Sequence, residues 1–130
     1  MDEHPNAALV RKMTESFNSG DLQQMADMVA DDIEWHEIGR AEPIIGKEAL
    51  AARFGMGSGT PPPYEITGST HDVIANDDHT IVLANAHAVK DGQTFDYRVA
   101  EIYHMKDGKI TARWAFSDDT QAINDFFKGE

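Results

Sequence analysis

The spacing of hydrophobic residues predicts two helices in the first third of the chain. The stretch 5–20 begins with a proline, which suits a first helical turn, and ends with a glycine, which suits a helix end. Its apolar side chains recur at helical spacing, at Val10, Met13 and Phe17. Asp21 is placed to cap a second helix, with Gln24 three residues later as its capping-box partner.

Alternating patterns predict strands in most of the remaining chain. Residues 31–38, DDIEWHEI, have the period of a short strand, and GKEALAARF after them has the period of a short helix. The segment GMGSGTPPP at 55–63 predicts an irregular connection, because three consecutive prolines neither continue a helix nor pair in a central strand. Four strands and a final helix follow, at 64–75, 80–89, 95–105, 109–117 and 118–127.

The order of these elements indicates an α+β fold. Asp-Gly pairs at 91–92 and 107–108 predict tight hairpins, and such short connections exclude parallel crossovers between the later strands. Helices and strands are segregated along the chain, which is typical of the α+β class. A length of 130 residues suits one domain, which we expect to span residues 1–130. An antiparallel sheet curled round the early helices would enclose a pocket on its concave face.

Composition narrows the classes of partner. Eleven basic residues against 23 acidic ones give a formal charge of −12, which argues against binding to nucleic acid or to an anionic membrane. The chain has no cysteine, which suits a reducing compartment. The first residues lack the pattern of a signal peptide, and no apolar run is long enough to span a bilayer. We therefore expect a cytoplasmic protein.

The strand FDYRVAEIYHM at 95–105 carries a carboxylate on an apolar face. Glu101 shares its face with five apolar or aromatic residues: Phe95, Tyr97, Val99, Tyr103 and Met105. Burying an unpaired carboxylate is costly, so Glu101 should be partnered, protonated or used chemically.

Three segments resemble the SnoaL-like, nuclear-transport-factor-2-like superfamily, which includes ketosteroid isomerases, polyketide cyclases and limonene epoxide hydrolases. They are FNSGDLQQMADMVADDIEWHE from residue 17, GKEAL from residue 46 and YHMKDGKITARWAFSDD from residue 103. The resemblance covers nearly the whole chain. It implies a cone-shaped fold in which a curved sheet wraps round N-terminal helices over a cavity, and commonly a homodimer built on the sheet.

Side chains alternate between the two faces of a strand, and the resemblance implies which face points to the cavity. Together these predict the residues that line the cavity. The expected ligand-binding residues are Trp35, Asn85, Val89, Tyr97, Val99, Ala115 and Ser117, and the expected catalytic residues are Glu37, His87 and Glu101. Arg98 and Arg113 are expected on the outer face, in surface or dimer contacts. A register shift of one residue would invert the facing of any strand.

Two arrangements of the polar residues would support proton transfer. A carboxylate beside His87 would favour the charged forms of both groups, whereas Glu37 and Glu101 together would raise one carboxyl pKa and leave an acid beside a base. Purely structural roles are the alternative: His87 bonding a neighbouring strand, and Glu101 pairing with an arginine. No spacing of ligands predicts a metal ion, and no cofactor is expected.

Departures from the family leave two functions open. The resemblance places a catalytic aspartate on the last strand, where this chain has Ala115, and the epoxide hydrolase triad is absent. The first function is a cofactor-independent acid–base catalyst, of isomerase, cyclase or hydrolase type, acting on a small hydrophobic molecule. The second is a protein that binds a ligand without turnover, or a dimeric scaffold.

Overall fold

The computed structural model describes residues 3–53 and 64–127, and the predicted connection at 55–63 lies outside these described residues. The helices are α1 (Pro5–Ser19), α2 (Leu22–Asp27), α3 (Lys47–Arg53) and α4 (Thr120–Phe126). The strands are β1 (Val29–Trp35), β2 (Ile44–Ile45), β3 (Tyr64–Ala75), β4 (His79–Lys90), β5 (Gln93–Lys106) and β6 (Lys109–Phe116). The short β2 is an element that the sequence pattern did not predict.

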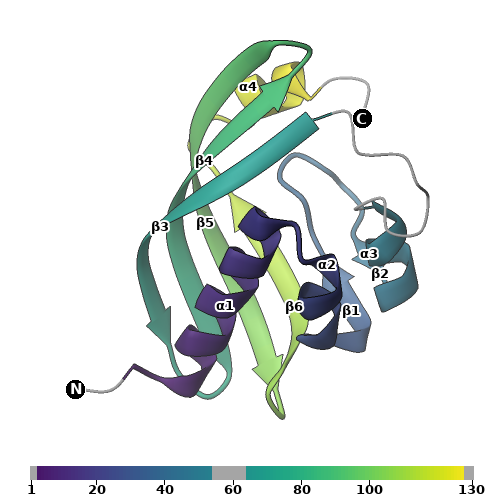
Figure 1. Cartoon of the computed structure of the whole chain (residues 1–130), viewed down its shortest axis with the longest axis vertical. Helices are drawn as coiled ribbons and strands as arrows, with labels where there is room; N and C mark the ends of the chain where they lie inside the picture. The colour runs from purple at the N-terminus through teal and green to yellow at the C-terminus, as the bar shows by residue number, and fades with distance from the viewer. Residues whose placement is uncertain (1–2, 54–63, 128–130) are drawn as a thin grey trace.

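All six strands form one sheet in the order β2-β1-β6-β5-β4-β3 (Figure 1). Neighbours pair antiparallel, except that β1 runs parallel to β6. The helix α1 lies across one face of the curved sheet, here called the inner face, and α4 lies near the end where β3, β4 and β5 begin or turn (Figure 1). The predicted α+β class, with a mostly antiparallel sheet and a C-terminal helix, is confirmed.

Both predicted Asp-Gly hairpins are present. Asp91 and Gly92 have φ of 53° and 77°, and Asp107 and Gly108 have φ of 53° and 76°. Two consecutive residues with positive φ give the turn whose twist matches that of paired strands, and Asp-Gly adopts it readily. These turns fix the register of β4 against β5 and of β5 against β6.

The structure confirms Asp21 as the cap of the second helix, but it does not confirm Gln24 as the capping-box partner. The Asp21 side chain accepts a hydrogen bond from the backbone N–H of Gln24 at 3.2 Å. The Gln24 side chain does not complete a capping box, because its Oε1 lies 2.5 Å from the hydroxyl of Ser16 instead. That contact ties α2 to α1.

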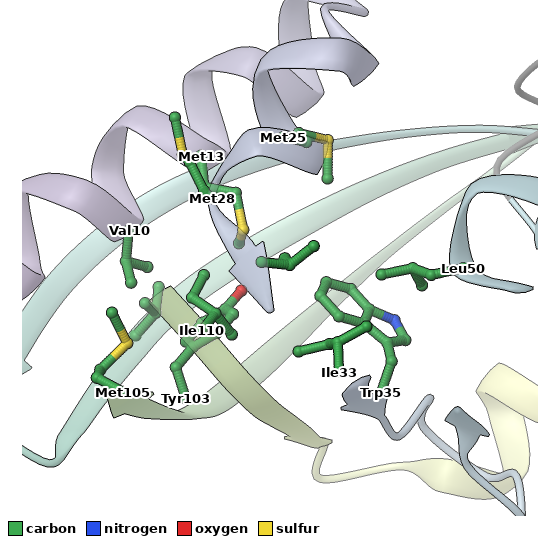
Figure 2. Close-up of a cluster of buried hydrophobic side chains, with 12 residues drawn as sticks. Val10, Met13, Met25, Met28, Ile33, Trp35, Leu50, Tyr103, Met105 and Ile110 are labelled. Atoms are coloured by element: carbon green, nitrogen blue, oxygen red, sulfur yellow. The ribbon is translucent and has the colours of Figure 1, made fainter. Parts of the chain in front are cut away.

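The main core lies between the inner face and the helices α1, α2 and α3 (Figure 2). Ile33, Tyr103 and Ile110 from three strands are almost fully buried, against Val10 and four methionines. Burying each large side chain contributes roughly 1.5–3 kcal/mol. No helix within the described ranges is both long and apolar enough to cross a membrane.

The opposite, outer face of the sheet carries apolar side chains that no helix covers in this part of the chain. Ile74, Phe116 and Leu83 are 56%, 53% and 37% exposed. A row of rings crosses the same face, with centroid distances of 4.6 Å for His79–His104 and 4.7 Å for both His104–Trp114 and Trp114–His36.

Candidate functional site

A cavity of about 340 Å³ opens where the end of β1, the end of α3, the inner face and α4 come together. Its lining is mixed in character. The polar or charged members are Glu37, Arg40, Arg53, Tyr64, Tyr97, Arg113 and Asn124, and the others are Ile38, Gly39, Ile66, Ile123 and Phe127. This volume falls in the range of about 300–1,000 Å³ that is usual for small-molecule sites.

Glu37 brings a carboxylate to the wall of the cavity. It follows β1 by two residues, and its Oε1 accepts a hydrogen bond from Nε of Arg53, the last residue of α3, at 3.0 Å. The two side chains are 22% and 26% exposed. The other carboxylate oxygen has no hydrogen-bond partner within the described residues, so it is available to a bound molecule.

Arg113 is held from three directions. Its Nε and Nη2 donate to Oε2 of Glu101 at 3.1 and 2.7 Å, and its Nη1 donates to the backbone carbonyl of His36 at 2.9 Å. The guanidinium carbon lies 4.5 Å from the centre of the Trp35 indole ring, which is a cation–π contact. A guanidinium restrained on its edge and its face has little freedom left to move.

Glu101 is therefore partnered, which answers the question raised by its sequence. The hydroxyl of Tyr103 donates to the same Oε2 at 2.8 Å. Burial opposes the charge on Arg113, but the attraction of Glu101 and then of Tyr103 outweighs it, so the pKa of Arg113 is raised. Burial, and then the negative charge of Glu101, raises the pKa of Tyr103 well above its ordinary value.

Tyr97 supplies a neutral hydroxyl to the cavity. Burial raises its pKa to about 12; Arg113 opposes this shift, while Glu101, Tyr64 and Glu37 add to it. The phenol therefore stays protonated at neutral pH and can donate a hydrogen bond.

The aromatic ring of Phe127, the residue directly after α4, closes the other side of the cavity. Phe127 meets the rings of Tyr64 and Tyr97 edge-on, at centroid distances of 5.2 and 6.3 Å. Gly39 lies so close to Asn124 that a Cβ on the glycine would be 2.1 Å from the amide oxygen. The loop after β1 and the helix α4 therefore pack closely against each other at the cavity wall.

The structure brings together only part of the predicted site. Glu37 and Tyr97 line the cavity as expected. Trp35 and Glu101 lie behind its wall, where both contact Arg113. Val99 and Ala115 share the inner face with Glu101, since Val99 lies on the same strand two residues away and Ala115 is its cross-strand partner, but neither lines the cavity.

The predicted facing of β4 is wrong. Ala86 is the cross-strand partner of Tyr97, so the alanines point inward and the alternate residues, Asn85, His87 and Val89, point to the outer face. There Nδ1 of His87 lies 2.5 Å from Oδ1 of Asp96, and the histidine side chain is 48% exposed. His87 therefore cannot meet Glu37 and Glu101 in one hollow.

The expected facings of Ser117 and Arg113 are also corrected. Ser117 follows β6, donates to the backbone carbonyl of Arg98 at 2.6 Å and borders a depression on the outer face rather than the cavity. Arg113 points inward, because it is paired with the inward-facing Tyr103. Arg98 does lie on the outer face as expected, where it pairs with Asp118.

Several cavity residues were not found from the sequence, although three of them carried a usable signal. Arg113 is two residues from Ala115, and strand periodicity puts both on one face. Asn124 and Phe127 are three residues apart on α4 and its end, which is the spacing of one helix face. Arg53 carried no such signal, because its position depends on how α3 packs.

The assembled groups can support proton transfer without a metal ion. Glu37 offers a proton acceptor, Tyr97 a neutral donor, and Arg113 a fixed positive charge beside them. Within residues 3–53 and 64–127, no three His, Asp or Glu side chains gather in a way that could hold a metal ion.

Comparison with known proteins shows the family. Residues 10–113 match the SnoaL-like domain. Bal32a from a soil-derived mobile gene cassette is 25% identical with a TM-score of 0.81, and the alignment covers 95% of this chain and 97% of that one. No curated protein matches the sequence.

Two further solved structures share the fold at lower identity. A candidate polyketide cyclase from Xanthomonas campestris pv. campestris is 22% identical with a TM-score of 0.76, over 92% of this chain and 94% of that one. An LEH-like epoxide hydrolase of M. tuberculosis is 17% identical with a TM-score of 0.77, over 96% and 88%. With a domain match over most of its length and this fold, the chain belongs to the SnoaL-like family.

Proposed function

We propose that the protein is a cofactor-independent acid–base catalyst acting on a small, largely hydrophobic molecule that carries a carbonyl group. Glu37 takes a proton from the carbon next to the carbonyl. Tyr97 donates a hydrogen bond to the oxygen on which negative charge develops, and Arg113 stabilises that charge. In a substrate with a carbon–carbon double bond β,γ to the carbonyl, return of the proton to the γ-carbon moves the double bond into conjugation with the carbonyl and completes an isomerisation.

The observation that carries this proposal is that Glu37, Tyr97 and Arg113 line one cavity of about 340 Å³. The contribution of the Glu37 charge to the raised pKa of Tyr97 indicates that the two groups are close enough to interact. Isoleucine and phenylalanine side chains in the same wall would receive the apolar body. The similar folds of a candidate polyketide cyclase and an epoxide hydrolase support this class of chemistry.

A second function, ligand binding without turnover, is favoured by one specific feature. Ala115 stands where the catalytic aspartate of related enzymes is expected, and alanine cannot accept a proton. In this alternative the pair Glu37–Arg53 only shapes the cavity.

An exchange experiment tests the catalytic function. The bicyclic ketone 2-tetralone is incubated with the protein in D₂O, and loss of its α-proton signals is followed by NMR. Proton transfer by a positioned group contributes about 10²–10⁴ in rate, so we expect Glu37→Gln to lower the catalysed rate by at least about 10². Tyr97→Phe should lower it too, and the outer-face variant His87→Ala is the matched control that should leave it unchanged.

Two outcomes would contradict the catalytic function. One is exchange no faster than the uncatalysed rate in the wild-type protein. The other is equal rates in wild type and Glu37→Gln, which would take the proton acceptor away from Glu37. Binding of 2-tetralone without exchange would favour the second function.

We also propose that the protein works as a cytoplasmic homodimer. The outer face carries Ile74, Leu83 and Phe116 with more than a third of each side chain exposed. A second copy placed against this face would remove that apolar surface from water. The cytoplasm is proposed because a chain without cysteine requires no oxidising compartment.

A further inference from the structure

Arginine side chains gather in the wall of the cavity, although the whole chain is strongly acidic. Among the described residues that line it are the three arginines Arg40, Arg53 and Arg113, of which Arg53 pairs with Glu37 and Arg113 with Glu101. The formal charge of the chain is −12. A surface of this sign disfavours anions in general, so a cavity lined by arginines marks a local exception.

Arg113 presents an unused pair of donors. A guanidinium has five N–H groups, and its bonds to Glu101 and to the carbonyl of His36 use one each on Nε, Nη2 and Nη1. Among the described residues, one N–H therefore remains on each terminal nitrogen. Two N–H donors on neighbouring nitrogens can both bond to a carboxylate.

The groups around Arg113 favour recognition of an anion over a structural role alone. Glu101 holds the Nε–Nη2 edge of the guanidinium and Trp35 lies against its face, so the remaining donors are fixed in advance. Such preorganisation lowers the entropy lost on binding. Glu101 also compensates part of the charge, so an incoming anion competes with it for Arg113.

We propose that the natural ligand of the cavity is an anion, a compact hydrophobic molecule bearing one carboxylate or acidic enol that binds the Nη1–Nη2 edge of Arg113. This inference rests on the proposed function only in taking the cavity to be the ligand site. It adds the chemical class of the ligand, and it holds whether or not the ligand is turned over.

The test uses two probes of the same shape. 1-Adamantanecarboxylate has a compact apolar body and one carboxylate, and 1-adamantanecarboxamide is its neutral counterpart. Trp35 fluorescence, measured in a Trp114→Phe background, reports binding next to Arg113 because the two side chains are in contact. At pH 7 we expect the carboxylate to bind about tenfold more tightly than the amide.

Variants assign the preference to Arg113. The double variant Glu101→Gln/Arg113→Gln removes both charges together, so no unpaired charge is left behind, and it should bring the affinity ratio of the two probes to about one. Glu101→Gln alone removes the competing carboxylate and should raise the ratio. Arg98→Gln, which removes a cation from the outer face, is the matched control and should not change it.

The inference is overturned if the wild-type protein binds both probes equally or binds neither, or if the double variant keeps the preference for the carboxylate. These results are separate from those of the exchange experiment. Preference for the carboxylate without exchange of 2-tetralone protons would refute the catalytic function and leave the anion site standing. Exchange of 2-tetralone protons without a preference for the carboxylate would support the catalytic function and refute the anion site.

Discussion

The Oε2 atom of Glu101 lies 2.7 Å from Nη2 of Arg113, between two strands whose inner faces are otherwise largely apolar. The two side chains are 16% and 14% exposed. Each charge is buried enough that it would destabilise the fold if it were unpaired, and the ion pair offsets that destabilisation. Arg113 is thereby held against Trp35 in the wall of the cavity.

Removing one member of this pair should destabilise the protein. Glu101→Leu leaves the Arg113 charge buried without its partner, and breaking a buried pair in this way costs about 3–5 kcal/mol. Glu101→Gln should cost less, because the amide oxygen still accepts hydrogen bonds. Urea unfolding followed by circular dichroism measures both. Asp118→Asn, which breaks the exposed pair with Arg98, is the control and should have little effect.

Two glycines with nearly the same φ allow the cost of backbone strain to be measured apart from the cost of a steric clash. Gly39 and Gly92 have φ of 76° and 77°, but an added Cβ meets Asn124 only at Gly39 and nothing within 4 Å at Gly92. Gly92→Ala should cost about 1–2 kcal/mol from backbone strain alone. Gly39→Ala should cost more and should weaken ligand binding, because Asn124 must move out of the cavity wall. Equal losses in urea unfolding would refute the close contact.

Stability should fall at alkaline pH. The pKa of Tyr97 is about 12 in the folded protein against 10.0 ordinarily, so above pH 10 the unfolded chain loses this proton while the folded chain keeps it. The stabilisation is therefore complete below pH 10 and is lost as pH rises to 12, at up to about 1.4 kcal/mol per pH unit for each such tyrosine. The pKa of Tyr103 is also raised, so this tyrosine likewise lowers the stability of the folded protein as the pH rises.

The alkaline effect can be assigned with one variant. Urea midpoints measured between pH 9 and 12 should fall less steeply in Tyr97→Phe than in the wild-type protein. An identical slope in both would mean that Tyr97 titrates normally and is not the neutral donor proposed for the cavity.

A charged residue on the outer face should produce monomers. Phe116 and Leu83 are the cross-strand partners of Ala100 on either side of β5, and Phe116→Asp places a carboxylate where the proposed dimer would bury an aromatic ring. Analytical ultracentrifugation should show the wild-type protein as a dimer and this variant as a monomer. Lys106→Asp, at the exposed end of β5, is a charge-changing control that should remain dimeric. A monomeric wild type would refute the dimer.

The hairpins and the facing of β5 could be predicted because local chemistry determines them. Asp-Gly pairs select one turn type, and the run of large apolar residues in β5 allows only one inward face. The helices of the first third follow in the same way from their periodicity and from Asp21 at a helix start.

The facing of β4 was mispredicted because alanine is small enough to lie on either face of a sheet, so its positions do not indicate which face is buried. Ala84, Ala86 and Ala88 lie opposite Val99, Tyr97 and Phe95, so small residues on one strand accommodate large ones on the next. This complementarity becomes visible only when the strands are aligned. The position of Arg53, and with it the pairing of Glu37, depends on packing between elements that the pattern of a single strand does not contain.

The parallel pairing of β1 with β6 affects the order in which the protein can form. Trp35 is aligned with Arg113, so β1 can pair with β6 only after the long segment between them has been synthesised. Contacts so distant in sequence form late, because the long intervening segment must first be brought into a compact arrangement. Glu37 and Arg113 therefore come together only after β6 has been made, so the proposed ligand site cannot form on a shorter nascent chain.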